Sequence, residues 1–466
     1  MERYKKILVT VQFLTIKNIT NFAFFISFLL CWLLPSGYHY GLMILSIAGI
    51  YLMLQNNSLE IRNSHLNAFY HKYYFLLIIP LYLILWYFRD FGIIICSLFA
   101  LCLLLTNYKT SRKFTSQNKF ILAVVLYCLL ESLFVQIPNY DIREYKNLRV
   151  IFLVGIFAFY LFLHYLPKIE VFINSITVFL LVSFVLVLYA RLFLHIPVGK
   201  EFNHIIHHTI FSNLVLLFSA CLFLLAEDVK NNLTKYSYYA IAALGLFAAF
   251  LSGARVSLLV LPVLLFWILL FSNSKNKRKI LLLLAAIAAI YACYYGLFSL
   301  FELHRHSVLS DIVNYRQGNS LTSQGMRLEM YKCGLQIFAD KPILGGYVDS
   351  DIYVYSAKGI CSPLFLQIDF MHFHNEYIDR LARAGIIGLA LQLAFLLLPL
   401  YFYSSIYRQN KANRYAQLGI ILCFWAVVIS LPDAMFYHKI NLSFVTLLHC
   451  YLIANILRGL SKNSSF

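Results

Sequence analysis

Residues 385–405 read GIIGLALQLAFLLLPLYFYSS, a stretch that contains no charged residue. An α-helix needs about 20 consecutive apolar residues to cross a bilayer. The stretch meets that length and therefore predicts a membrane-spanning helix. Similar runs lie on both sides of it, because 61% of the 466 residues are hydrophobic and only 12% are charged. A soluble protein with so little charge could not cover its surface with polar groups, so the composition excludes that class.

Apolar runs of this kind recur along the whole chain, and they predict an all-α polytopic integral membrane protein. We expect about twelve to fourteen transmembrane helices, because two pairs of neighbouring runs have almost no loop between them. The first pair meets at Pro35 and the second at Ser252. The expected spans lie near residues 19–35, 38–54, 73–88, 91–108, 120–138, 150–167, 171–194, 213–227, 237–252, 255–271, 280–298, 385–405, 416–432 and 441–457.

Lys and Arg residues are unevenly distributed between the loops that join these runs. If the N-terminus lies in the cytoplasm, the basic loops at 109–119, 272–279 and 408–414 lie there too. An excess of basic residues in short loops marks the cytoplasmic side of a membrane protein. The pattern predicts that both termini are cytoplasmic, and it accounts for most of the net charge of +18. A basic protein can bind nucleic acid, but this arrangement favours membrane orientation, and we expect no nucleic-acid partner.

One hydrophilic segment is long enough to fold outside the bilayer, on the outward side of this topology. We expect an N-terminal transmembrane bundle over residues 1–298, an outward loop subdomain over 299–384 and C-terminal transmembrane helices over 385–466. Within the loop, residues 325–338 are predicted to be helical, and the Pro and Gly residues of 341–346 should end that helix. We expect no cleavable signal peptide, because the first apolar run lacks a small-residue cleavage site.

Two of the ten cysteines, Cys333 and Cys361, lie in this outward loop, and the other eight lie within the expected spans. Cysteines in spans behave as small hydrophobic residues. Disulfides form in oxidising compartments outside the cytoplasm. A disulfide between Cys333 and Cys361 and a pair of free thiols are both compatible with the sequence.

Ionisable side chains inside or at the edge of a membrane are costly, so they are the first candidates for function. Glu131 lies in the middle of an apolar run, where it is either a proton relay or the structural partner of a helix dipole or a polar neighbour. Arg255 follows Ser252-Gly253-Ala254 at the outer end of a span. Its guanidinium suits bidentate contact with a phosphate, and the alternative is an anchor at the membrane interface.

Arg327 and His374 are the candidates within the outward loop. Arg327 lies in the first turn of the helix predicted there, where backbone N–H groups and a guanidinium together could receive a phosphate. The alternatives are a solvated charge and an ion pair with Glu329. His374 can accept a proton from a sugar hydroxyl as a neutral imidazole, although an isolated histidine is more often a surface residue. His372 is two residues away and would face elsewhere on a helix.

A third outward group is the cluster of His204, His207 and His208. Metal binding there is one interpretation, but no Cys or acidic residue accompanies these histidines at the spacing of metal ligands. We therefore expect no bound metal. The chain also contains no Walker-type Gly-Lys-Ser/Thr loop, no Rossmann glycine pattern, no CxxC and no HExxH sequence. An ATP-driven pump and a metal-dependent nucleotide-sugar transferase are thus unsupported, and we expect no cofactor.

Several of these positions occur in a characteristic order. The sequence SGARVS occupies residues 252–257, and RLEMYK begins at Arg327 and is followed by KPILG. HNEY at 374–377 then precedes GIIG at 385–388, which opens the next span. In order, setting and residue type, this region resembles the O-antigen ligase and O-antigen polymerase superfamily of bacterial envelopes. The rest of the chain resembles that family only as a hydrophobic chain of many spans.

The resemblance implies a glycosyltransferase of the bacterial inner membrane. Members of that family move a glycan from undecaprenyl diphosphate to an acceptor sugar on the periplasmic face, without a nucleotide donor or a metal ion. Carried over to this chain, Arg255 and Arg327 would hold the diphosphate and His374 would be the general base, with inversion at the anomeric carbon. The large outward loop would then be periplasmic. The chain departs from many relatives at Arg383-Ala384, where they carry an acidic residue.

The resemblance leaves the acceptor open. One large loop late in the chain favours the ligase, whose acceptor is the lipid A core, over the polymerase and a protein-glycosylating relative. A lipid-linked glycan flippase is the alternative from another class, but the chain has no repeated halves of the kind that transporters show. A membrane scaffold without chemistry would leave the three candidate positions unexplained. Residues that could line a substrate groove are Arg191, His204, His208, Tyr347 and Asn375.

Overall fold

The described part of the chain is entirely helical in its regular structure. The computed structural model describes residues 116–136, 154–164, 166–193, 208–252, 257–272, 308–346, 351–366, 372–434 and 439–463, together with residues 21, 151 and 254. No strand occurs among these residues. Apart from residue 21, the expected spans near 19–35, 38–54, 73–88, 91–108 and 280–298 lie outside the described residues.

Each expected span within the described residues overlaps a helix. These helices are α5 (Ser116–Glu131) with its π-helical continuation η1 (Ser132–Gln136), η2 (Val154–Ala158) with α8 (Phe159–His164), α9 (Ile169–Leu192), α10 (His208–Ala226), α11 (Asn232–Leu251), α12 (Ser257–Phe271), α17 (Glu376–Gln409), α18 (Arg414–Ile429) and α19 (Lys439–Asn463). Among the described helices, α9, α10, α17 and α19 are long and apolar enough to cross a membrane. The prediction of an all-α polytopic membrane protein is confirmed.

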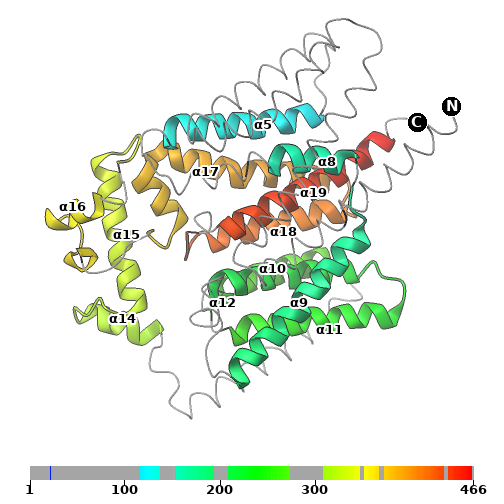
Figure 1. Ribbon diagram of the computed structural model, residues 1–466, viewed down its shortest axis with the longest axis horizontal. Coiled ribbons are helices and arrows are strands. Elements are labelled where there is room, and N and C mark those ends of the chain that lie inside the picture. The colour runs from blue at the N-terminus through cyan, green and yellow to red at the C-terminus, as the bar shows by residue number, and fades with distance from the viewer. Residues whose placement is uncertain are drawn as a thin grey trace, which may run out of the picture.

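Helix α10 lies at the centre of the bundle. Every residue from Thr209 to Ala226 is buried, and α9, α11, α12 and α18 pack around it (Figure 1). A helix that is apolar on all sides must be covered by other helices or by lipid, and here helices cover it. Helix α17 instead leaves Leu397, Leu398 and Tyr401 exposed, which is a face suited to contact with lipid.

A second, smaller core lies at one end of the bundle. It is built around α14 (Val308–Arg316), α15 (Ser323–Asp340), α16 (Asp351–Ala357) and the 3-10 turn η3 (Pro363–Leu366). Figure 1 shows α14, α15 and α16 grouped at the left, beside the first turns of α17. The buried residues of this core are Met330, Cys333, Ile337, Ile352, Tyr355, Cys361, Phe365, Phe373 and Ala382.

Helix α15 is the main element of this core, and the helix predicted over 325–338 lies within it. It begins after Thr322, whose hydroxyl accepts a hydrogen bond from the Gly325 N–H. It ends at Asp340, directly before the Pro and Gly residues that were expected to stop it. A disulfide joins Cys333 of α15 to Cys361, which follows α16, and it ties the two helices together.

Helix α17 is broken at Gly385, the residue at which the span was predicted to begin. Gly385 has φ +61° and ψ −157° in the middle of the helix. The turn at 341–346 packs into the break, and the Ile386 N–H donates a hydrogen bond of 2.8 Å to the Pro342 carbonyl oxygen. A Cβ atom on Gly385 would lie 2.3 Å from the Ile343 carbonyl oxygen. Only glycine meets both the positive φ and this close approach.

We predict that Gly385→Ala lowers the apparent unfolding temperature of the detergent-solubilised protein markedly. A non-glycine residue with these backbone angles costs about 1–3 kcal/mol, and the new Cβ also collides with backbone that cannot move aside. Gly318→Ala is the matched control, because Gly318 has φ +88° but open space around its Cβ position. Equal shifts for the two variants in a thermal unfolding scan would contradict the packing described for Gly385.

Candidate functional site

His374 has a strained backbone conformation at the start of α17. Its φ of +48° is the only positive value of a non-glycine residue in the described part of the chain. Two hydrogen bonds hold it: the His374 N–H donates to Nδ1 of His372 (3.1 Å), and the Tyr331 hydroxyl donates to the His374 carbonyl oxygen (3.1 Å). Such strain persists only where the surroundings enforce it, and it is frequent at functional sites.

The His374 side chain is paired with Asp433. Its Nδ1 lies 3.3 Å from Oδ1 of Asp433, which also accepts the Ala434 N–H at 2.9 Å. A carboxylate only accepts hydrogen bonds, so we assign the imidazole proton to Nδ1, which leaves Nε2 as the proton acceptor. The Asp433 side chain is only 9% exposed, whereas that of His374 is 33% exposed. A substrate can therefore reach the imidazole while its orienting carboxylate stays buried.

Asp433 was missed by sequence reasoning. It lies 59 residues beyond His374, in the turn after α18, and no spacing rule links the two. The signal that could have found it is an acidic residue at the end of an apolar run. The same argument singled out Arg255 at the outer end of another run.

Three hydrogen bonds bring α17 and the end of α18 together and so place Asp433 beside His374. The Glu376 N–H donates to the Ser430 carbonyl oxygen at 2.9 Å. Nδ2 of Asn375 donates to the Leu431 carbonyl oxygen at 2.8 Å, and the Tyr377 hydroxyl donates to the Val427 carbonyl oxygen at 2.9 Å. Oδ1 of Asn375 caps α17 by accepting two backbone N–H groups. A part for Asn375 in a substrate groove stays a prediction.

Arg327 lies on α15 one turn before Tyr331, so both side chains share a face of the helix. Burial raises the pKa of the Tyr331 phenol, the Arg327 charge opposes that rise, and the Asp433 charge adds to it. Arg327 is thus within electrostatic reach of the hydroxyl that contacts His374. Glu329, a possible ion-pair partner of Arg327, instead accepts hydrogen bonds from Tyr315 and Lys332. Among the described residues, Arg327 forms no ion pair.

The close approach of α15 to the start of α17 depends on a second glycine. A Cβ atom on Gly334 would lie 2.5 Å from Cγ2 of Ile378 and 3.2 Å from the Phe373 ring. The absence of a side chain at this position lets α15 pack directly on the residues around His374. Tyr331, one turn after Arg327, thereby reaches His374, which lies 43 positions further along the chain.

A buried ion cluster lies beneath this site. Nη1 of Arg380 donates to Oε1 of Glu131 at 2.6 Å, and Nε donates to Oε1 of Glu376 at 3.3 Å. All three side chains are less than 10% exposed. Glu131 on α5 is therefore the ion-pair partner of Arg380 on α17. Of the two roles expected for Glu131, the structure supports the structural partner.

Arg383 forms a second buried pair one turn further along α17. Its Nε donates to Oδ2 of Asp379 at 2.9 Å, and Oδ1 of Asp379 accepts the Phe373 N–H at 3.1 Å. Arg383 thus neutralises a carboxylate that fixes the backbone next to His374. The charged residues that α17 contributes to the two pairs all lie before the break at Gly385, and the long apolar stretch of α17 follows that break.

The remaining predicted site residues are only partly described. Nε of Arg191 donates to the Leu251 carbonyl oxygen at 2.7 Å and so ties the end of α9 to the end of α11. In the chain, Leu251 shortly precedes Arg255. His208 begins α10, but its side chain is not among those described. Arg255, His204 and Tyr347 lie outside the described residues, and their roles stay predictions.

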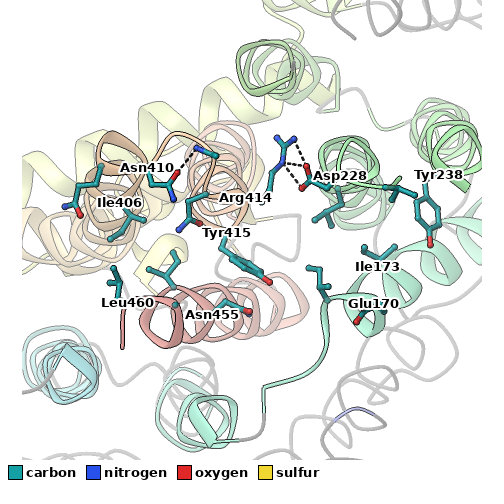
Figure 2. A pocket seen from close by; sticks show the side chains of 18 of the residues that line it. Glu170, Ile173, Asp228, Tyr238, Ile406, Asn410, Arg414, Tyr415, Asn455 and Leu460 are labelled. Carbon is teal, nitrogen blue, oxygen red and sulfur yellow. Dashed lines mark hydrogen bonds and ion pairs between the residues drawn. The ribbon is translucent and has the colours of Figure 1, made fainter. Parts of the chain in front are cut away.

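A large cavity lies at the opposite end of α17. It has a volume of about 870 Å³ and is lined by residues of α9, α10, α11, α17, α18 and α19 and of the loops beside them. Figure 2 shows Arg414 directed at Asp228, to which it donates hydrogen bonds of 2.9–3.0 Å. Arg414 also pairs with Glu227 at 3.0 Å. Its charge is thus already neutralised, and this cavity is separate from the His374 site.

Fold and site together define a polytopic helical membrane protein with a candidate acid–base centre at one end of its bundle. Residues 240–393 match a protein-family model described as O-Antigen ligase. The chain is 26% identical over 199 residues to the O-antigen ligase of Escherichia coli strain K12, which covers 42% of this chain and 45% of the relative. The resemblance to the O-antigen ligase superfamily is confirmed.

A second relative is an uncharacterized protein of Haemophilus influenzae strain Rd, 25% identical over 247 residues, which covers 50% of this chain and 59% of the relative. The chain thus spans about half the length of the curated relatives it matches. The stretch matched by the family model contains Arg327, His374, Asp379 and Arg380, whereas Glu131 and Asp433 lie outside it.

We predict that Arg380→Ala strongly destabilises the protein, because it leaves Glu131 and Glu376 as buried carboxylates without their cation. Removal of one partner of a buried pair costs about 3–5 kcal/mol. The apparent unfolding temperature in detergent measures the effect, and Arg316→Ala on exposed α14 is the control. A second change, Glu131→Gln, should recover part of the loss, and wild-type stability of Arg380→Ala would contradict the structural role.

Proposed function

We propose that this protein is a glycosyltransferase that moves a glycan from undecaprenyl diphosphate to an acceptor sugar of the lipid A core. The observation that carries the proposal is the pairing of His374 with Asp433 beside Tyr331 and Arg327. The family match supports transfer of a lipid-linked glycan in general. The donor, the acceptor and the mechanism are our inference from the site.

In this proposal Arg327 and Arg255 hold the diphosphate of the donor. A lipid diphosphate is a good leaving group when its developing negative charge is stabilised, and guanidinium groups do this by bidentate hydrogen bonding. Arg327 suits the role because no acidic residue within the described part of the chain neutralises it. Its position on α15 puts the charge on the same side of the helix as the contact with His374.

His374 acts as the general base. Its Nε2 takes the proton of the acceptor hydroxyl while that oxygen attacks the anomeric carbon of the donor sugar. The bond from that carbon to the diphosphate oxygen breaks, and undecaprenyl diphosphate leaves with the electron pair. Asp433 stabilises the imidazolium that forms and keeps the ring in the correct orientation. In-line attack inverts the anomeric carbon, and the diphosphate leaves without help from a metal ion or nucleotide.

We place this site on the periplasmic face of the inner membrane, with both termini in the cytoplasm. The disulfide between Cys333 and Cys361, in the same unit as Arg327, supports an oxidising compartment on that side. The basic segment 408–414, which ends at the first residue of α18, lies at the opposite end of α17 and is one of those assigned to the cytoplasm.

We predict that His374→Ala abolishes glycan transfer while the protein still inserts into the membrane. A general base contributes about 10²–10⁴-fold to a rate, and Asp433→Asn should lower the rate with little change in KM. The lipopolysaccharide pattern of a deletion strain that carries each variant measures whether transfer occurs, and a transfer assay with the purified protein separates rate from KM for Asp433→Asn. A wild-type amount of glycan on the lipid A core with His374→Ala would refute the base. A deletion strain whose core carries one repeat unit, rather than none, would identify a polymerase.

We predict that Arg327→Ala weakens binding of the lipid diphosphate and raises KM for the donor. Arg327→Lys should rescue binding poorly, because an ammonium cannot make the bidentate contact of a guanidinium. Binding of the undecaprenyl diphosphate donor to the purified protein in nanodiscs measures the effect directly. Arg316→Ala, on the exposed surface of α14, is the matched control, and equal affinities of the two alanine variants would argue against a phosphate site at Arg327.

A further inference from the structure

Three potential metal ligands meet at the proposed general base. His372, His374 and Asp433 each offer one ligand atom, and these atoms all lie within 4.8 Å of one another. The His372 and His374 rings are edge to face, with centroids 4.2 Å apart. The sequence reasoning had placed His372 on another face, on the assumption of a helix. Because residues 372–375 precede α17 and are not helical, the two imidazoles lie side by side instead.

The spacing of two of these ligands already matches a shared ion. Nδ1 of His374 and Oδ1 of Asp433 lie 3.3 Å apart. Bonds of about 2.0–2.1 Å from a tetrahedral zinc ion put neighbouring ligand atoms about 3.3 Å from one another. Two imidazoles and one carboxylate are also a donor set that zinc and related transition metals prefer. The third ligand, His372, binds when its ring exchanges the hydrogen bond from the His374 N–H for a bond to the metal.

We propose that His372, His374 and Asp433 form a binding site for a divalent transition metal ion such as zinc, and that the bound ion switches the transferase off. The inhibitory part rests on the proposed function of His374. A metal on Nδ1 of His374 takes the position of the Nδ1 proton, and the one proton of the neutral imidazole then resides on Nε2. Nε2 becomes a donor and can no longer accept the proton of the acceptor hydroxyl.

The surrounding charges allow this site to fill and empty. Asp433 contributes one negative charge. The charges of both Arg327 and Asp433 act on the Tyr331 phenol, so the positive charge of Arg327 is near enough to oppose the binding of a metal ion. Glu376 and Asp379, on the adjoining turn, are engaged with Arg380 and Arg383. The ion therefore gains only one carboxylate, which suits a reversible inhibitory site rather than a permanent structural one.

The first test is metal binding by the purified, tag-free protein after treatment with EDTA. Cobalt(II) serves as the spectroscopic substitute for zinc, and a tetrahedral absorption band that zinc removes is the expected result. His372→Asn should weaken binding by at least about tenfold, because the shorter side chain can still accept the His374 N–H but offers no imidazole. Asp433→Asn should weaken it similarly. Unchanged affinity in both variants would overturn the site.

The matched control is His204→Asn combined with His208→Asn, which removes the other histidine pair that could hold a metal. That variant should bind cobalt as the wild-type protein does, and loss of binding there would instead assign the metal to the 204–208 cluster and refute the proposal. The second test adds zinc to the transfer assay: zinc should inhibit the wild-type enzyme, and EDTA should restore it. Full activity with cobalt bound at the site would refute the switch.

The two proposals fail separately. If no form of the protein transfers glycan, the proposed function is wrong, yet the cobalt titration still decides whether the three residues bind metal. If the titration shows no binding while His374→Ala abolishes transfer, the metal site is wrong and the general base stands.

Discussion

The ion pair between Arg380 and Glu131 is the contact on which the position of the site depends. It joins α17 to α5 across 249 positions of the chain, and both side chains are buried. A buried charge that loses its partner is strongly destabilising, so α17 cannot rotate or slide without a large cost. The second pair, Arg383 with Asp379, lies on the next turn and restricts the same half of the helix.

The restraint passes from these pairs to His374 through the backbone. Asp379 accepts the Phe373 N–H, directly before the histidine, and Asn375 caps the helix directly after it. The break at Gly385 lets this charged half of α17 receive the 341–346 turn while the apolar half continues through the bundle. A side chain held from both sides in this way is placed for chemistry without a further rearrangement.

The two ends of α17 differ in how their arginines are used. At the cavity end, Arg414 is held by Asp228 and Glu227, so its charge is already neutralised by the protein. At the other end, Arg327 forms no ion pair within the described part of the chain, although Glu329 lies two positions away and is bound to Lys332 and Tyr315. An anionic ligand would therefore be attracted to the His374 end, which is where the proposed chemistry needs it.

Composition and hydropathy were sufficient for the class of protein, because a run such as 385–405 has only one stable environment. They also singled out Glu131 and Arg255, since ionisable residues inside or at the end of apolar runs are costly. Arg327 and His374 were found by the chemistry of their side chains in the outward loop. The same local signals left Glu131 with two possible roles and Cys333 with two possible states. They omitted Asp433 and assigned His372 to the wrong face. Each of those outcomes depends on which helices are neighbours and on where α17 begins. Hydropathy and spacing describe a chain locally, whereas the pairing of Arg380 with Glu131 and of His374 with Asp433 exists only after distant helices have packed together.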